Sequence, residues 1–165
     1  MSGEERRIQL LIVDDEEKFL ETIAARLRLK DFDVVTASNG KDALKVSKKA
    51  KFDVAILDLR MPDMDGSEVL KVLKKKHKYL EAVMLTGHAT IDSAVECTKL
   101  GAFDYLEKPY DFDNLVNVLQ RAYQARLMRK FQHDKQKREQ LEMLAMGSSP
   151  MAILKSLVRV DDDEK

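Results

Sequence analysis

Acidic side chains follow two short apolar runs in the first half of the sequence. Asp14 and Asp15 come directly after residues 8–13, and Asp58 ends the run 54–58, just before a turn with proline and glycine. Apolar runs of this length that end at turn residues are typical of buried strands. If both strands belong to one parallel sheet, their carboxyl ends lie at the edge where such sheets bind ligands.

A hydroxyl and an ammonium group are expected at the same edge. Thr86 ends the apolar run 82–86 and Lys108 follows the run 103–107, whereas the run 33–37 ends without a comparable group. Three carboxylates within a few ångströms of one another cannot all stay ionised without a cation. Mg²⁺, bound by one or two carboxylates and by water, is the usual intracellular solution.

These groups together meet the requirements of phosphoryl transfer. A carboxylate supplies the nucleophile, a metal ion neutralises charge on the oxygens, and a positioned cation completes the site. Asp58 would be the acceptor and would form an acyl phosphate.

Each residue also has an ordinary structural explanation. Asp14 or Asp15 alone would more often cap the following helix, and Asp58 alone could hydrogen-bond its own turn. Thr86 alone is a common strand end, and a single lysine such as Lys108 is usually solvated. The conjunction of suitable residues on four strands, with none on the second strand, favours the chemical interpretation.

The order of the segments predicts an α/β fold. Apolar strand-like runs alternate with helical patterns in five units of roughly 20 to 28 residues. This alternation implies a five-stranded parallel sheet that is doubly wound, flavodoxin-like and ordered 2-1-3-4-5. The switch point of that order lies between strands one and three, which are the two strands that end in acids.

Composition places the chain among soluble proteins with one domain and a tail. The 165 residues are 44% hydrophobic and 35% charged, and their formal net charge of zero favours neither binding nor avoidance of nucleic acid. Cys97 is the only cysteine, which fits a reducing cytoplasm. No apolar run approaches the roughly 20 residues that span a bilayer, so we expect a cytoplasmic protein without a membrane anchor.

The last quarter of the chain differs in character from the rest. Residues 1–123 are expected to form the domain, and 124–146 to form a charged helical linker without glycine or proline. Residues 147–165 form a short tail that opens with glycine, serine and proline. An apolar heptad repeat is not cleanly sustained in the linker, so a coiled coil is only weakly indicated.

Four segments carry a specific resemblance to a known family. They are LIVDDE at 11–16, DLRMPDMDG at 58–66, MLTGH at 84–88 and GAFDYLEKP at 101–109. With them, residues 8–123 resemble the receiver domain of bacterial two-component response regulators. The resemblance implies a switch that takes a phosphoryl group from a histidine kinase and catalyses its own phosphorylation and dephosphorylation, without being a turnover enzyme.

The resemblance also assigns the residues of the acceptor site. Asp58 is the phosphoacceptor, and Mg²⁺ is bound by the carboxylates of Asp15 and Asp58 and by the backbone carbonyl of Arg60. Asp14 contributes to the metal site partly through water. 

The remaining assignments concern the conformational switch. Lys108 pairs with a phosphoryl oxygen, and its bond to Pro109 is expected to be cis. Thr86 is the switch hydroxyl, and the ring of Tyr105 turns inward as Thr86 moves toward the phosphoryl group. Such a switch is a population shift between two packings.

Within the family, the segments 86–95 and 101–106 are most similar to the nitrogen-regulatory class, which activates sigma-54 RNA polymerase. The tail 147–165 resembles, loosely, the opening of the AAA+ ATPase domain of that class. No G-x-x-x-x-G-K-[ST] loop and no helix-turn-helix is present, so this chain itself is not expected to hydrolyse ATP or bind DNA. It would be either a shortened activator or a natural regulator without its effector domain.

Other functions stay open at this point. A phosphatase with an aspartyl-phosphate intermediate needs a second acid two residues after the nucleophile, where this chain has Arg60. An unphosphorylated adaptor of the same fold would typically lack an acid or the lysine. A stand-alone receiver could serve as a phosphate sink or shuttle. We expect the switch to homodimerise through the last receiver helix and the linker.

Overall fold

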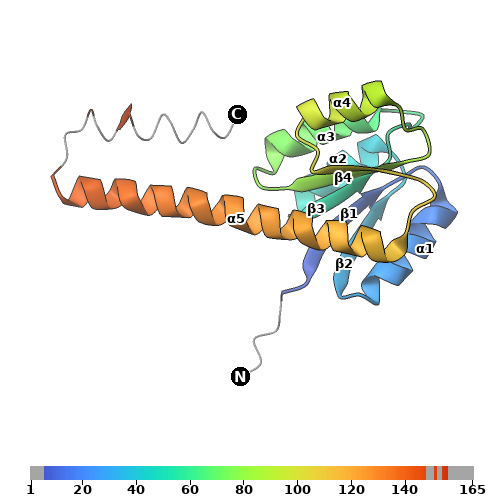
Figure 1. Cartoon of the computed structure of the whole chain (residues 1–165), viewed down its shortest axis with the longest axis horizontal. Helices are drawn as coiled ribbons and strands as arrows, with labels where there is room; N and C mark the ends of the chain where they lie inside the picture. Colours follow the sequence, from blue (N-terminus) through green and yellow to red (C-terminus); the bar gives the residue numbers. More distant parts are fainter. Residues whose placement is uncertain (1–5, 148–150, 152–153, 156–165) are drawn as a thin grey trace.

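The computed structural model describes residues 6–147, 151 and 154–155. Within this range a sheet lies between two layers of helices, and one long helix projects well beyond the sheet (Figure 1). The tail predicted for 147–165 falls almost entirely outside the described residues.

The sheet has the predicted topology. Its strands are β1 (Ile8–Val13), β2 (Phe32–Ala37), β3 (Val54–Leu57), β4 (Glu81–Thr86) and β5 (Asp104–Glu107). All neighbours are parallel, and the order is β2-β1-β3-β4-β5, which confirms the doubly wound sheet. Every residue of β3 and β4 is buried, because helices cover both faces of the sheet centre.

Helices cover the two faces unequally. One face packs against α1 (Glu17–Arg28) and the first part of α5 (Phe112–Ala145). The other packs against α2 (Gly40–Lys49), α3 (Gly66–Lys76) and α4 (Ile91–Lys99). Successive residues of a strand point to opposite faces, so β1 contributes Leu10 and Ile12 to one core and Leu11 and Val13 to the other.

Helix α5 runs unbroken through the predicted boundary at residue 123. Its 34 residues span about 51 Å, and it ends just before Gly147, whose φ of 81° is left-handed. No helix among the described residues combines the length and the apolar character that crossing a bilayer requires. The predicted helical character of residues 124–146 is confirmed, whereas the division into domain and linker stays a prediction.

Two ion pairs fasten α5 to the sheet at the amino ends of the strands. Arg126 Nε lies 3.0 Å from Asp53 Oδ1, and Arg129 pairs with Glu81. Both acids are buried, with 1% and 5% of their surface exposed, and they lie at the start of β3 and β4. The first part of the predicted linker therefore contacts the domain, a contact that sequence patterns did not indicate.

Replacing Arg126 with alanine should lower the free energy of unfolding by about 1–3 kcal/mol. Removing one partner of a buried pair is destabilising, although Asp53 would keep the Arg6 guanidinium at 3.6 Å and the hydrogen bond from the Gln9 amide at 2.9 Å. Urea denaturation measures the loss, and Arg121→Ala, at an exposed position of the same helix, is the control. Equal stability of the two variants would show that the pair contributes nothing.

Candidate functional site

Three carboxylates converge at the carboxyl edge of the sheet. Strands β1 and β3 are adjacent, with Val13 opposite Leu57, so the residues that follow them lie side by side. Oxygens of Asp14, Asp15 and Asp58 all lie within 4.8 Å of one another. The structure thus brings together the three acids that the sequence singled out.

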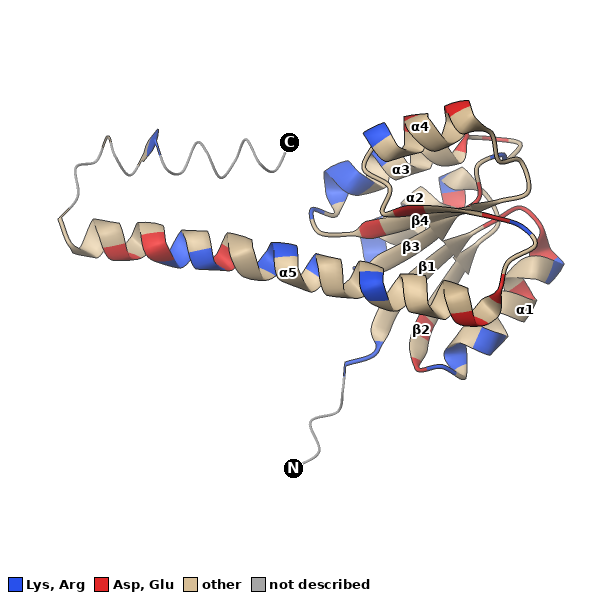
Figure 2. Ribbon diagram, in the orientation of Figure 1, with Lys and Arg blue, Asp and Glu red and all other residues tan. Residues whose placement is uncertain are grey.

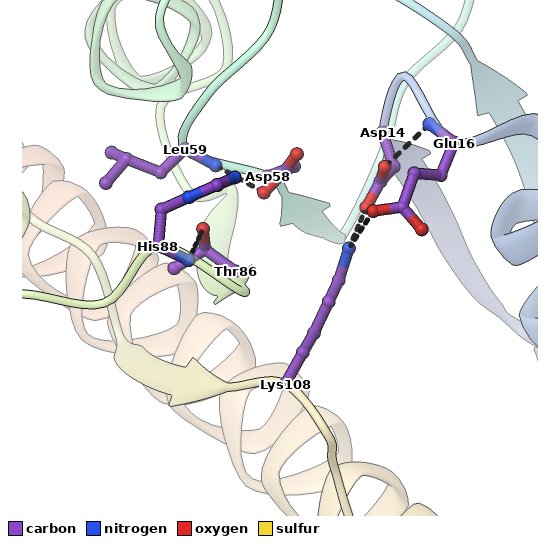
Figure 3. Close-up of polar contacts among 7 residues, drawn as sticks. All are labelled: Asp14, Glu16, Asp58, Leu59, Thr86, His88 and Lys108. Atoms are coloured by element: carbon purple, nitrogen blue, oxygen red, sulfur yellow. Dashed lines mark hydrogen bonds and ion pairs between the residues drawn. The ribbon is translucent and has the colours of Figure 1, made fainter.

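Lys108 reaches this cluster from the end of β5. Its Nζ lies 2.6 Å from Asp14 Oδ2 and 3.9 Å from Glu16 Oε1 (Figure 3). Its ammonium group also sits over the ring of Phe19. The Lys108–Pro109 peptide bond is cis, as the resemblance implied. The side chain therefore enters the acidic cluster, with its direct hydrogen bond to Asp14.

The capping explanation for Asp14 does not describe its role here. The residue before α1 is Glu16, whose side chain makes no capping hydrogen bond. Asp14 instead accepts a hydrogen bond from the Glu16 amide at 2.9 Å through one oxygen and binds Lys108 through the other. Asp15 stays exposed beside it.

Backbone hydrogen bonds hold Asp58 in place. The Leu59 amide donates to Asp58 Oδ1 at 2.9 Å, and the Asp58 amide donates to the Val13 carbonyl at 2.9 Å. Thr86 is fully buried at the end of β4, and its hydroxyl accepts a hydrogen bond from the His88 amide at 3.0 Å (Figure 3). Arg60 follows in the turn with its side chain exposed.

The backbone of the turn after β3 packs closely against Asp58. A Cβ on Gly66 would lie 2.0 Å from the Asp58 carbonyl oxygen, so only glycine fits this close approach. Asp63 accepts hydrogen bonds from the Lys41 amide at 3.0 Å and the Gly40 amide at 3.2 Å, which ties the turn to the start of α2. These bonds, that from Lys41 first, lower the pKa of Asp63. The role of Asp63 was not foreseen, because its partners are 22 and 23 residues away.

Burial dominates the electrostatics of the acids. Burial first, and then the charge of Asp14, raise the pKa of Asp58 to about 6 against the opposing effects of Lys108, the Thr86 hydroxyl and the Leu59 amide. Burial also raises the pKa of Asp14, although Lys108 opposes the shift. One lysine does not neutralise three clustered carboxylates, so the cluster suits a hard divalent cation with oxygen ligands.

The predicted switch aromatic lies at the far end of the same edge. Tyr105, on β5, is half-buried, and its hydroxyl lies 2.6 Å from Ser93 Oγ. Ser93 and Thr90 form the capping box of α4. Tyr105 therefore joins β5 to the start of α4, rather than entering the carboxylate cluster.

Comparisons with a family model and with curated proteins point to the same family. Residues 10–120 match the family model described as the response regulator receiver domain. The chain is 37% identical over 122 residues to the regulatory protein AtoC of Escherichia coli, which covers 74% of this chain and 26% of that protein. It is 42% identical over 117 residues to a putative NtrX-like response regulator of Rickettsia bellii, covering 70% of this chain and 24% of that protein.

Solved structures agree with the sequence matches. A CheY-like receiver domain protein from Methanospirillum hungatei has a TM-score of 0.73 at 25% identity and covers 75% of this chain and 99% of that one. NtrX from Brucella abortus, solved in complex with ADP, has a TM-score of 0.73 at 30% identity and covers 81% of this chain and 30% of that one.

The chain spans about a quarter of the length of the curated relatives described above. The match to the receiver model nevertheless extends over most of its residues and includes four strands of the sheet completely and β1 from Leu10 onward. The chain therefore belongs to the response regulator receiver domain family of two-component systems.

Proposed function

We propose that Asp58 accepts a phosphoryl group from the phosphohistidine of a histidine kinase. Receiver domains are phosphoacceptor switches, and the observation that carries the assignment to this residue is the cluster of three acids beside Lys108. Asp58 is the buried acid whose two neighbours, Thr86 and Lys108, supply a hydroxyl and an ammonium group.

The transfer is a substitution at phosphorus. An Asp58 carboxylate oxygen forms the new O–P bond while the P–N bond breaks, and its electron pair stays on the departing imidazole, which takes up a proton. The Leu59 amide keeps Asp58 oriented through the hydrogen bond to Oδ1. Because the acceptor is already fixed, little reorganisation is needed at the moment of transfer.

Mg²⁺ would be held by Asp14, Asp15 and Asp58 with the Arg60 carbonyl, as in the acidic pocket of receiver domains. When bound, it would neutralise charge on the phosphoryl oxygens. Lys108 would then exchange part of its contact with Asp14 for a phosphoryl oxygen. This chain would thereby catalyse its own phosphorylation and, with water as the nucleophile at phosphorus, its own dephosphorylation.

The phosphoryl group would act on Thr86 and Tyr105. The Thr86 hydroxyl moves toward a phosphoryl oxygen, and the space it leaves admits the Tyr105 ring, which gives up its contact with Ser93. The equilibrium between the two packings shifts because only one of them hydrogen-bonds the phosphoryl group.

The downstream output is proposed to be control of transcription through self-association. The described part of α5 beyond residue 123 exposes large apolar side chains, which supports a second copy as the partner: Leu127, Met128, Phe131, Leu141 and Leu144. Residues 124–146 would then be the linker to an effector of the sigma-54 activator type. A stand-alone phosphate sink, shuttle or adaptor is the alternative.

Incubation with acetyl phosphate and Mg²⁺ should add one phosphoryl group to the wild-type chain and none to Asp58→Asn. Intact-mass spectrometry measures the gain. Asp65→Asn is the matched control, because Asp65 lies exposed in the same turn without a side-chain capping bond. Phosphorylation of the Asp58→Asn variant at the wild-type level would assign the acceptor elsewhere.

The stability of the protein without Mg²⁺ should fall as the pH rises through the range between 3.8 and about 6, in which Asp58 ionises in the unfolded chain but keeps its proton in the folded one. Asp58→Asn removes this cost and should be more stable than wild type by about 1–3 kcal/mol at pH 8. The difference should vanish near pH 4. Urea denaturation at both pH values measures it, and a constant difference would contradict the raised pKa.

A double change of Leu127 and Phe131 to glutamate should lower the dimer population by at least about tenfold, because it places charge in an apolar interface. Light scattering after gel filtration, with and without beryllofluoride, measures it. Gln124→Glu, at an exposed position of the same helix, is the control. A wild-type monomer under both conditions would instead favour the sink, shuttle or adaptor.

A further inference from the structure

Positive charge gathers at the end of the domain opposite Asp58. Helices that connect parallel strands run back against them, so α2, α3 and α4 all end at the amino edge of the sheet. Each ends in lysine: Lys48 and Lys49 on α2, Lys74, Lys75 and Lys76 on α3, and Lys99 on α4. Figure 2 shows blue ends of helices at this side and red segments mainly at the other.

Two adjoining hollows lie on this edge, between the helix ends and α5. One has a volume of about 570 Å³ and the other about 700 Å³, and Lys78 and Tyr79 line both. Among the residues that the structure describes, their walls carry ten lysines and arginines but only one acid, Glu81. We refer to the lining of both hollows as the basic surface.

The single acid of the basic surface does not balance its charge. Glu81 is already paired with Arg129 and lies 3.8 Å from Lys74 Nζ. His133 lines the same hollow as Glu81, and burial, together with the charges of Lys78 and Lys137, lowers its pKa. The Tyr79 hydroxyl is buried without a hydrogen-bond partner among the described residues. The surface thus carries excess positive charge, which suits carboxylate or phosphate oxygens.

We propose that the basic surface is the docking site of the acidic run 161–164 of the same chain. This run, Asp-Asp-Asp-Glu, is one of two places in the sequence with four consecutive acids, and it lies outside the described residues. The other, residues 14–17, belongs to the edge that holds Asp58. Docking would join the ends of α3 and α4 to the chain that follows α5.

The covalent geometry permits this contact. From Gln136, which lines one hollow, to Ala145 the helix advances by about 14 Å. Fifteen residues lie between Ala145 and Asp161, and the sixteen steps from one to the other cover about 53 Å when extended. The left-handed Gly147 ends the helix, with its amide bonded to the Leu144 carbonyl, so the helix does not fix the direction of the chain beyond this point.

Nucleic acid is a weaker match for the basic surface than an acidic peptide. Single-stranded nucleic acids are held by exposed aromatic rings on which bases stack. The aromatic lining residues are Tyr79 and Phe52, and Phe52 has only 3% of its surface exposed. Charge is therefore the main feature that the surface offers.

The test compares amide NMR spectra of the full chain with those of a variant in which Asp161, Asp162 and Asp163 become asparagine and Glu164 becomes glutamine. The amides of Lys78, Lys99 and Gln132 should shift, and those of Asp14 and Asp58 should not. Raising the salt concentration should move wild type toward the variant, because exposed ion pairs are screened. A synthetic peptide of residues 156–165 should restore the wild-type shifts when added to the variant.

A matched variant tests the other side of the contact. In Lys78→Gln with Lys99→Gln, the peptide should bind at least tenfold more weakly than in Lys18→Gln with Lys45→Gln, whose lysines are exposed elsewhere. Unchanged amides on neutralising the run would overturn the proposal. Carbodiimide crosslinks that form only between differently isotope-labelled chains would also overturn the proposal, because the occupant would then be a second copy. Displacement of the run by a single-stranded oligonucleotide at equal charge concentration would overturn it in favour of nucleic acid.

Discussion

Burial of ionisable carboxyl groups at the carboxyl edge of the sheet is the constraint on which the rest of the site depends. Asp14 and Asp58 have 1% and 4% of their surface exposed, and burial raises the pKa of both. Lys108 makes its short contact with Asp14 and not with Asp58. Asp58, the proposed acceptor, is thus the less compensated of the two buried acids, which leaves it the stronger attraction for a metal ion and an electrophile.

The backbone around the buried Asp58 is held rigidly in place. Gly66 lets the backbone of the turn pass against the Asp58 carbonyl, and Asp63 fastens the same turn to the first amides of α2. The N-terminus of a helix favours a carboxylate, because its amides lack partners and its dipole is positive. Asp58 therefore starts from a fixed turn, and a site that is held in advance loses little entropy when the reaction begins.

Local patterns were sufficient to predict the sheet and the residues at its edge. Each strand is a short apolar run that ends at a polar group, and this signal depends on neighbours in sequence alone. It also located Asp14, Asp58, Thr86 and Lys108, because strand ends in a parallel sheet share one edge. The pattern could not choose the partner of Lys108, because Asp14 and Asp58 are both acids at that edge.

Contacts between distant segments were beyond these patterns. Asp63 looks like an ordinary turn residue, and its bonds depend on where α2 lies. Asp53 precedes β3 and Glu81 is the first residue of β4, positions where an acid is usually solvated. Their pairing with Arg126 and Arg129 requires α5 to continue past the domain in one particular direction. The charged helix was therefore predicted correctly as a helix, while its attachment to the sheet was not.

These attachments connect the two edges of the sheet. Strand β3 leads from Asp53 to Asp58, and β4 leads from Glu81 to Thr86. The strands that lead to Asp58 and Thr86 at one edge are thus bound to α5 at the other. A buried ion pair is costly to break, so the first part of α5 would stay docked during the proposed movement of Thr86. A change at Asp58 would then reach a partner through side chains on the surface of a helix that keeps its place, and not through release of the helix.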